Sequence, residues 1–552
     1  MTSSRIGFLA KERIVAGAGF NRWLLPPAAL AIHLCIGMAY GFSVFWKPLE
    51  GALTDENGAP VALCSAGATS FADKLAGTFR AMSASDCNWS QFDLGWTYTL
   101  FFVVLGLSAA LFGPWVERRG PRIAGLMATA CWCAGLTIGG VGVRFHSLWL
   151  MWLGTGLVGG VGLGIGYISP VSTLMKWFPD RRGMAAGLAI AGFGGGAMIG
   201  SPLATLLMAS FEPGSAGVAR TLYCMAAIYA VFMTFGSLAY RIPPAAWRPA
   251  GWIGSAGEHP DAAEQYVHVE SAHRTPQFWL LWLMLCMNVS AGIGVIGAAS
   301  PMLQETFGGV LAGRADLSIA ALRTDPDLMK RAASVAAGFV GLLSLFNILG
   351  RFFWASASDR IGRRTTYIVF FTAGIASYLL AAHAADTKSL GLFVGALCLI
   401  ASMYGGGFAT IPAFLADLFG SKYVGAIHGR LLTAWSMAGI FGPIIVNTLH
   451  DLREQSGRVS PDMIYGSILT TLAVTLGVGL IATLLVRPVA DIHLHSAETP
   501  ESLPDDNDAR DGMRNQAEGT FSWSLGLAWL FVLIPIGFGL WMTGMKTLVF
   551  FR

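Results

Sequence analysis

Long apolar stretches follow one another along most of this 552-residue chain, each close to the ~20 residues that cross the hydrocarbon of a bilayer as a helix. Only 12% of the residues are charged, about half the share that is usual in a soluble domain. Inside lipid, every backbone polar group must be bonded internally, and a long apolar stretch achieves this as a helix. The sequence therefore predicts an all-α membrane protein.

The predicted spans form two sets of six and one further helix. They lie at 24–46, 94–116, 123–143, 147–171, 184–208 and 221–240, then at 278–301, 333–354, 366–384, 390–416, 430–448 and 465–486, and finally at 521–545. The corresponding domains are a first half (1–240), a cytoplasmic linker (241–276), a second half (277–487), an acidic disordered linker (488–520) and an extra helix (521–552). The extra helix either spans or lies in the interface, and its uncharged central twenty residues favour spanning.

An internal repeat relates the two sets of helices. Residues 113–122 read GPWVERRGPR and residues 355–364 read ASASDRIGRR. At the same offset of 242 positions, further residues match between the halves: Glu117 with Asp359, Arg118 with Arg360, Gly120 with Gly362, Arg122 with Arg364, Pro170 with Pro412, Gly183 with Gly425, and Gly187 with Gly429. Several independent matches at one offset predict two structurally related halves in tandem.

The distribution of Lys and Arg predicts the orientation. The loops that follow the second, fourth and eighth spans are rich in Lys and Arg, and all of them fall on one face of the bundle. By the positive-inside rule this face, together with the N-terminus, is expected to be cytoplasmic. The long loop between the first two spans then lies outside, where its Cys64 and Cys87 either form a disulfide or stay free.

The two charged turns follow the pattern G-x-x-x-[DE]-R-x-G-[RK]-[RK], the loop motif of the major facilitator superfamily. The first copy has Pro121 where a basic residue is usual, and the second has Ala355 where the leading glycine is usual. An acid in such a turn can pair with an Arg and with a helix N-terminus of the neighbouring bundle. We expect the following residues to control opening and closing: Gly113, Glu117, Arg118, Arg122, Asp359, Arg360 and Arg364.

Further segments resemble the oxalate:formate antiporter family of that superfamily. They are YGFSVF with Lys47 and Pro48 (40–48), the glycine-rich run that joins the fourth and fifth spans (164–202), GRFFWASASDRIGRR (350–364) and TAWSMAGIFGP (433–443). The resemblance covers most of the chain up to Arg487. It implies a bundle of two six-helix halves around a central site and transport by alternating access.

Arg351 is the most informative single residue. It precedes Asp359 by eight residues, which places it about 12 Å deeper along a helix that rises ~1.5 Å per residue. The repeat has Ala109 at the matching position, so the fold itself does not require the charge. A guanidinium within the bilayer faces a partner or a wet cavity, snorkels to the surface, or binds a substrate. Because its planar fork matches a carboxylate, and because the resemblance implies a carboxylate-binding arginine here, we expect substrate binding.

The resemblance also implies a second cation, a lysine in the eleventh span, in members that exchange oxalate. The matching position here is Trp435, which favours a monocarboxylate such as formate, pyruvate or lactate. Aromatic residues are predicted either to line the cavity or to pack in the core: Tyr40, Trp96, Tyr98, Tyr167 and Tyr404. His33, in the first span, is either a packing residue or a proton-coupling group.

These features predict a secondary transporter for a small organic carboxylate, working as an antiporter or a proton-coupled symporter. The alternatives are a sensor built on a transporter fold and an exporter of other small solutes. No motif predicts catalysis, a cofactor or a metal site, and the net charge of +4 gives no reason to expect nucleic-acid binding. We expect a monomer in a bacterial inner membrane, with a small anion and the lipid bilayer as its partners.

Overall fold

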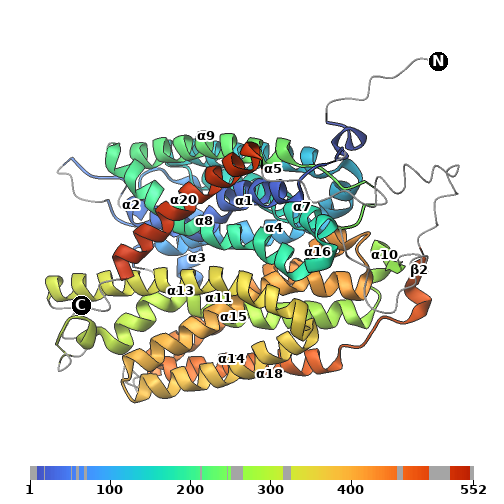
Figure 1. The fold of residues 1–552 in the computed structure, drawn as a ribbon. Helices are drawn as coiled ribbons and strands as arrows, with labels where there is room; N and C mark the ends of the chain where they lie inside the picture. The colour runs from blue at the N-terminus through green and yellow to red at the C-terminus, as the bar shows by residue number, and fades with distance from the viewer. Residues whose placement is uncertain are drawn as a thin grey trace, which may run out of the picture.

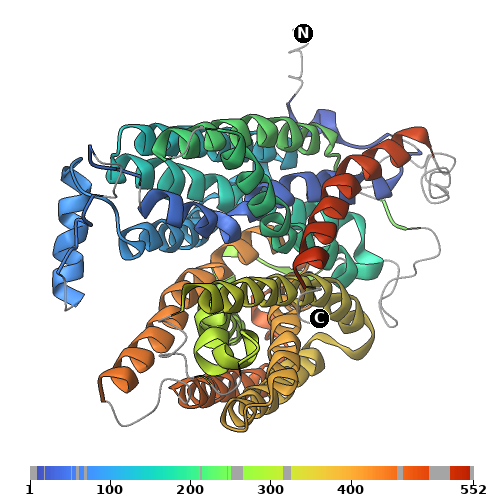
Figure 2. The ribbon, with the colours of Figure 1, turned by 90° about the vertical axis from the view of Figure 1, so that its left-hand side faces the viewer.

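A computed structural model describes residues 9–17, 19–50, 52–56, 61–67, 71–211, 214–244, 247–249, 265–314, 317, 325–456, 464–496 and 522–547. Within these ranges, thirteen helical segments are long and apolar enough to cross a membrane. The predicted fold class is confirmed: the helices form two six-helix halves, and one extra helix follows them. Figure 2 shows the blue-to-green helices of the first half grouped on one side of the yellow-to-orange helices of the second.

The helices of the first half are η1 (Lys11–Ile14), η2 (Arg22–Leu24), α1 (Leu25–Ile36), η3 (Gly37–Phe45), α2 (Trp46–Glu50), α3 (Phe71–Ser83), α4 (Gln91–Arg119), α5 (Pro121–Arg144), α6 (Leu148–Met151), η4 (Trp152–Gly159), α7 (Gly160–Trp177), η5 (Pro179–Arg181), α8 (Arg182–Ser210) and α9 (Ser215–Ala239). Besides the short 3₁₀ turns η1, η2 and η5, two longer stretches depart from α geometry: η3 is a 3₁₀ stretch and η4 a π stretch. The first span is therefore irregular toward its C-terminal end, and the fourth is irregular near its start.

The second half contains α10 (Val269–Ala272), α11 (Pro276–Leu311), α13 (Pro326–Ile361), α14 (Arg363–Asp386), α15 (Leu390–Phe419), α16 (Val424–Leu431), α17 (Thr433–Ser456), α18 (Ile464–Leu485) and η7 (Asp491–His493), and α20 (Trp523–Thr547) follows it. Strands β1 (Gln265–Val267) and β2 (Leu494–Ser496) pair antiparallel. The chain over 491–496 is thus regular, although it falls in the linker predicted to be disordered. Residues 497–520 of that linker lie outside the described residues.

Helix α4 connects the two ends of the bundle. Its N-terminus carries a capping box, in which Ser90 Oγ accepts from the Asp93 amide at 3.2 Å and the Asp93 carboxylate accepts from the Ser90 amide at 2.8 Å. Next to this end, the Cys64–Cys87 disulfide forms, which settles the alternative that the sequence left open. The other end of α4 carries the turn at Glu117. We call the ends the disulfide face and the basic face.

The repeated turns end α4 and α13 in the same way. Gly120 and Gly362, which the 242-residue offset relates, have φ angles of +89° and +85°. Residues with a Cβ rarely adopt this conformation, so a glycine stops each helix and starts the next one directly. The repeat that is visible in the sequence is therefore a repeat of backbone geometry.

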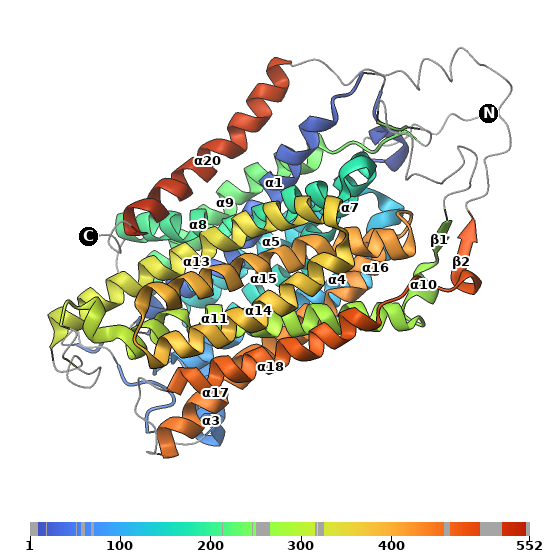
Figure 3. The ribbon, with the colours of Figure 1, turned by 60° about the horizontal axis from the view of Figure 1, so that its bottom comes forward.

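The halves meet mainly through two helices of the first half: α4 packs on α16 and α17, and α8 packs on α13 and α15. Figure 1 and Figure 3 show α20, in red, crossing obliquely over the first half toward α13. Its Phe531 ring lies 4.3 Å from that of Phe232 on α9, and its Gly539 packs against Met198 and Ile199 of α8. Because α20 also contacts α13, the extra helix packs on both halves.

Candidate functional site

Arg351, on α13, is fully buried between the two halves. Its Nε donates to Asn347 Oδ1 at 2.9 Å, one turn earlier on the same helix, and its Nη1 donates to the Ile190 carbonyl of α8 at 2.9 Å. Its Nη2 has no hydrogen-bond partner among the described residues. The guanidinium thus faces the opposite half, neither lipid nor the basic face, and its Nη2 nitrogen is left without an acceptor among the described residues.

Aromatic rings from both halves gather beside this guanidinium. We call them the central aromatic cluster: Tyr40, Phe102, Tyr167 and Phe193 from the first half, and Tyr404, Phe408 and Trp435 from the second. Trp435 lies at the centre, with ring centroids 4.4 Å from Phe408, 5.2 Å from Phe102 and 5.5 Å from Tyr167. The Arg351 Cζ lies 5.6 Å from the Phe408 ring centroid. The cluster therefore joins the halves and borders the buried charge.

Three donors at this place have no acceptor among the described residues. They are Arg351 Nη2, Trp435 Nε1 and the Tyr167 hydroxyl, and all three side chains are buried. A buried donor left without an acceptor costs about 1–3 kcal/mol, so native structures keep few of them. A small anion with several acceptor oxygens is the kind of ligand that satisfies such a set.

The other predicted cavity residues lie at different distances from this centre. The Tyr40 and Tyr404 hydroxyls approach to 3.4 Å across the halves. Tyr98 contacts the edge of the cluster through Phe102, with centroids 4.8 Å apart. Trp96 packs against Phe92, one turn earlier on α4, with centroids 6.2 Å apart, and among the described rings it contacts none of the cluster.

His33 lies behind the cluster within the first half. Its ring stacks on Tyr167 with centroids 5.3 Å apart. Nε2 lies 3.1 Å from the Tyr167 carbonyl, and Nδ1 contacts the Ala189 carbonyl. Both ring nitrogens therefore face backbone carbonyls of α7 and α8, and a neutral ring donates to one of the two.

Sequence reasoning missed several members of the site. Phe102, Phe193 and Phe408 complete the cluster, yet each stands in an apolar run where a core phenylalanine looks the same. Asn347 orients Arg351 and carried a usable signal, since it is a polar residue one helical turn from a buried charge.

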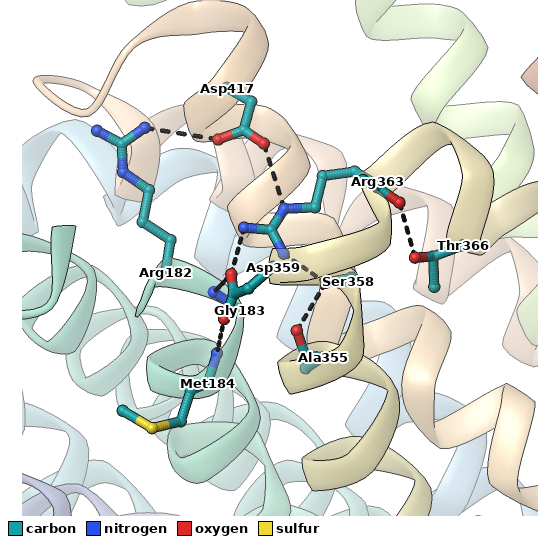
Figure 4. A network of polar contacts seen from close by, with 10 residues as sticks. Arg182, Gly183, Met184, Ala355, Ser358, Asp359, Arg363, Thr366 and Asp417 are labelled. Carbon is teal, nitrogen blue, oxygen red and sulfur yellow. Dashed lines mark hydrogen bonds and ion pairs between the residues drawn. The ribbon is translucent and has the colours of Figure 1, made fainter. Parts of the chain in front are cut away.

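Asp359 connects the halves at the basic face, as Figure 4 shows. Its carboxylate accepts from the backbone amides of Gly183 at 2.8 Å and Met184 at 3.0 Å, in the first turn of α8. Arg363, one turn later in the second half, pairs with the same carboxylate at 2.5 Å and with Asp417 at 3.2 Å. A carboxylate at a helix N-terminus is favoured by the helix dipole, so this contact stabilises the closed basic face.

Glu117 occupies the equivalent place in the first half, but its polar partners lie in its own half. Ser172 of α7 donates to its Oε1 at 2.6 Å, and Lys176 pairs with its other oxygen. The opposite half approaches it through Gly425, where an added Cβ would lie within 3.0 Å of the carboxylate. The repeat therefore matches in position and differs in bonding.

Paired glycines bring the halves into backbone contact near these acids. A Cβ added at Gly187 would lie 2.8 Å from the Arg351 carbonyl oxygen, and one at Gly429 would lie 2.9 Å from the Ala109 carbonyl carbon. Gly113, from the predicted motif, lies against Ala426 in the same way. Since Gly187 with Gly429 and Arg351 with Ala109 are repeat equivalents, the two inter-half contacts are copies of one another.

The motif arginines bind within their own halves. Arg122 donates to the carbonyls of Leu238 and Tyr240 at the end of α9, and Arg364 donates to those of Thr483 and Leu484 at the end of α18. Cations at helix C-termini are favoured by the dipole. Arg118 and Arg360 are exposed at the basic face. No group of three or more metal-ligating side chains occurs among the described residues.

Comparisons with known proteins agree with this architecture. A model of the Major Facilitator Superfamily matches residues 58–443 and 329–551. The chain is 28% identical over 351 residues to the oxalate:formate antiporter of Oxalobacter formigenes, covering 62% of this chain and 73% of that one. It is 25% identical over 386 residues to apicoplast pyruvate carrier 1 of Toxoplasma gondii, covering 61% and 66%.

Solved structures of transporters share the fold. The proton:xylose symporter XylE superposes with a TM-score of 0.53 at 12% identity, over 82% of this chain and 94% of that one. The Escherichia coli fucose:proton symporter FucP superposes with a TM-score of 0.52 at 12% identity, over 82% and 98%. With the family match over most of its length, and two six-helix halves that meet around a buried centre, the chain belongs to the major facilitator superfamily of transporters and resembles the oxalate:formate antiporter family within it.

Proposed function

We propose that this protein carries a small monocarboxylate across the membrane by alternating access, with Arg351 as the anchor for the carboxylate. One observation carries the proposal: a guanidinium buried between the two halves with one nitrogen unpaired. A carboxylate oxygen is the acceptor that such a nitrogen binds most strongly. The unpaired Trp435 Nε1 and Tyr167 hydroxyl add neutral donors beside it.

The same centre favours one carboxylate over two. Trp435 fills the position where relatives that exchange oxalate are expected to have lysine, so a dianion meets one buried cation where it would need two. The seven rings of the cluster leave an apolar surround that suits the methyl or hydrogen end of pyruvate, lactate or formate. The names of two relatives, an oxalate:formate antiporter and a pyruvate carrier, are consistent with this class.

The contacts at the basic face support a gating role for the repeated turns. Asp359 binds the α8 N-terminus across the halves, and the paired glycines allow backbone contact there. These contacts must separate when the basic face opens, while Arg122 and Arg364 keep each half intact. We infer that the basic face is cytoplasmic, because its loops carry the Lys and Arg residues, and that the protein works in a bacterial inner membrane.

Counterflow in proteoliposomes tests the proposal. Purified protein is reconstituted with formate, pyruvate, lactate or oxalate inside, and the exchange of labelled formate or pyruvate is measured. We expect exchange with monocarboxylates and about a tenfold or greater loss in Arg351→Lys, because lysine keeps the charge but cannot bind Asn347 and the Ile190 carbonyl while it presents a further nitrogen to the carboxylate. Arg144→Lys, an exposed arginine at the disulfide face, is the matched control.

Unchanged exchange by Arg351→Lys would remove Arg351 as the anchor. Absence of exchange with every acid, together with competition by cationic dyes for binding, would favour an exporter of other solutes. Binding of a carboxylate without any transport would favour a sensor.

A further inference from the structure

His428, on α16, is a buried imidazole that no predicted role uses. Neither of its ring nitrogens has a hydrogen-bond partner among the described residues. Its ring lies 5.9 Å from that of Tyr167, which belongs to α7 of the opposite half and to the central aromatic cluster. A polar side chain this deep without a partner calls for a role in which the partner arrives from outside.

His428 lies at the interface of the halves, and neighbouring elements carry other charged or titratable groups. Among the described side chains, the charged or titratable residues on the elements that pack against it, and on α1 behind Tyr167, are Tyr167 and Lys176 on α7, His33 and Cys35 on α1, Asp93, Tyr98, Glu117, Arg118 and Arg119 on α4, Cys398, Tyr404 and Asp417 on α15, Glu270 on α10 and His273 directly after it, Cys286 and Glu305 on α11, and His450 and Arg453 on α17. Arg430, on its own helix, donates to Glu270 at 2.6 Å and so points away from it. Lys176 and Glu117 pair with each other.

His33 and His428 differ in whether the groups around them belong to their own half or to the opposite half. The partners of His33 are backbone carbonyls of α7 and α8, which lie in the same half and move with it. His428 contacts Tyr167 across the halves, and α16 packs on α4 and α7 at the side where the basic-face contacts open. Rocking of the halves therefore leaves the surroundings of His33 intact and lets water reach His428.

We propose that His428 is a proton-binding site that couples proton movement to carboxylate movement. The inference rests on the proposed function. When the basic face opens, the unprotonated ring nitrogen of hydrated His428 takes a proton from water, and it gives the proton back to water when the carboxylate leaves. No covalent bond other than N–H forms or breaks. One carboxylate and one proton cross together, and no net charge moves.

The charges in the closed site explain why the carboxylate and the proton are transported together. The empty closed site holds the Arg351 charge and a neutral His428. The loaded closed site holds Arg351 neutralised by carboxylate and a protonated His428, so the buried charge is the same. Carrying the proton alone would bury two positive charges side by side, which is costly in a low dielectric. Each ligand therefore favours binding of the other, as linkage requires.

Uptake driven by a pH gradient, compared with uptake driven by a membrane potential, tests whether a proton crosses with the carboxylate. Proteoliposomes of wild type, His428→Gln and the exposed control His383→Gln are loaded with buffer, and net uptake of labelled formate or pyruvate is driven by a pH gradient or by a potassium diffusion potential. We expect wild type and control to respond to the pH gradient and not to the potential. Glutamine cannot be protonated at these pH values, so His428→Gln should lose the response to pH and gain one to the potential.

Persistence of pH-driven accumulation in His428→Gln, or its absence in wild type, would overturn the proposal. A binding measurement guards against misfolding of the variant: formate or pyruvate added to weakly buffered wild-type protein should draw protons from solution, read with a pH dye. No proton uptake despite Arg351-dependent binding would reject His428 and leave the proposed function standing. Loss of proton uptake in His33→Gln with retention in His428→Gln would move the site to His33.

Discussion

Single side chains at the centre of the bundle leave buried donors without acceptors among the described residues. Arg351 Nη2, Trp435 Nε1 and the Tyr167 hydroxyl are buried donors without acceptors, while the remaining Arg351 nitrogens are held by Asn347 and Ile190. Two fixed bonds orient the guanidinium, and the third donor stays available. Such preorganisation lowers the entropy that binding costs.

Removing one neutral donor should weaken binding without disturbing the cluster. Trp435→Phe keeps an aromatic ring against Phe408 and deletes the Nε1 hydrogen. We expect the affinity for the transported monocarboxylate to fall about two- to tenfold, which corresponds to one hydrogen bond of about 0.5–1.5 kcal/mol. Trp279→Phe, an exposed tryptophan at the basic face, is the control. Equal affinities for wild type and Trp435→Phe, measured by titration calorimetry, would show that the indole does not touch the ligand.

We expect His146 to make the disulfide face sensitive to acid. Its ring stacks on Trp89 with centroids 4.3 Å apart, and its Nε2 lies 2.9 Å from the Cys87 carbonyl. Burial lowers the pKa of His146 below its ordinary 6.5, and the Cys87 bond only partly opposes this effect. The folded state therefore holds neutral imidazole, and the stability is complete above about pH 6.5 and declines as the pH falls below it.

Thermal unfolding measured at several pH values between about 5.5 and 7.5 tests this. Wild type should lose stability toward the acidic end, whereas His146→Asn, which has no titrating ring and still suits the positive φ of this residue, should have a flatter profile. The exposed His383→Asn should keep the wild-type slope. Parallel profiles for wild type and His146→Asn would assign the acid sensitivity to another group.

For single residues, the sequence identifies charged members of the site more readily than aromatic ones. Arg351 stands out because a cation interrupts an apolar run where the repeat has Ala109. Phe193 and Phe408 do not, since burial in the core and burial around a site require the same residue type. His428 was hidden differently: the predicted eleventh span began at residue 430, which left this histidine in a loop beside Arg430.

At the scale of helices, irregular backbone lies next to the site. Tyr40 stands on the 3₁₀ stretch η3, and Trp435 follows the break at Leu432 between α16 and α17. A break of this kind inside a span re-aims side chains and allows one part of a helix to move against the other. Both halves thus contribute an interrupted span to the central aromatic cluster.

A methyl group at a backbone contact should open the basic face. In Gly429→Ala the new Cβ collides with the Ala109 carbonyl, an overlap worth about 1–3 kcal/mol. We expect faster amide hydrogen exchange in α16 and in the first turn of α8, because the closed state is disfavoured. Gly395→Ala on α15, where an added Cβ meets nothing within 4 Å, is the control. Exchange rates equal to those of the control would mean that the face does not separate along these glycines.

The length of the apolar runs predicted the positions of the helices well, but it did not predict where the backbone departs from a regular helix. All thirteen predicted spans overlap helical segments. Most of these segments extend further at one or both ends, because the polar ends of a helix leave the apolar pattern before the backbone does, while a few predicted ends pass the helix by one or two residues. The division of the eleventh span at Leu432 was not predicted, since neither proline nor glycine occupies the break. The β1–β2 pair was missed because its three-residue strands are too short for a period to be visible.

For the molecule as a whole, duplication gives the two inter-half contacts their common geometry, and sequence divergence gives them different bonding partners. Gly183 lies against Asp359 as Gly425 lies against Glu117. Asp359 accepts two amides from the other half, whereas the polar partners of Glu117 are Ser172 and Lys176 of its own half. Helix α20, outside the duplication, packs on both halves and adds a contact that rocking must accommodate.

This difference predicts that the two motif acids are unequal. Asp359→Asn loses charge-assisted bonds to the α8 N-terminus, each worth about 1.5–3 kcal/mol, so protection of the Gly183 and Met184 amides from hydrogen exchange should fall about tenfold or more. Glu117→Gln should change these amides less, because its broken bonds lie within the first half. Asp386→Asn, an exposed acid at the disulfide face, controls for charge. Equal loss of protection in both variants would mean that the halves separate as a symmetric pair and that the bonding difference has no mechanical consequence.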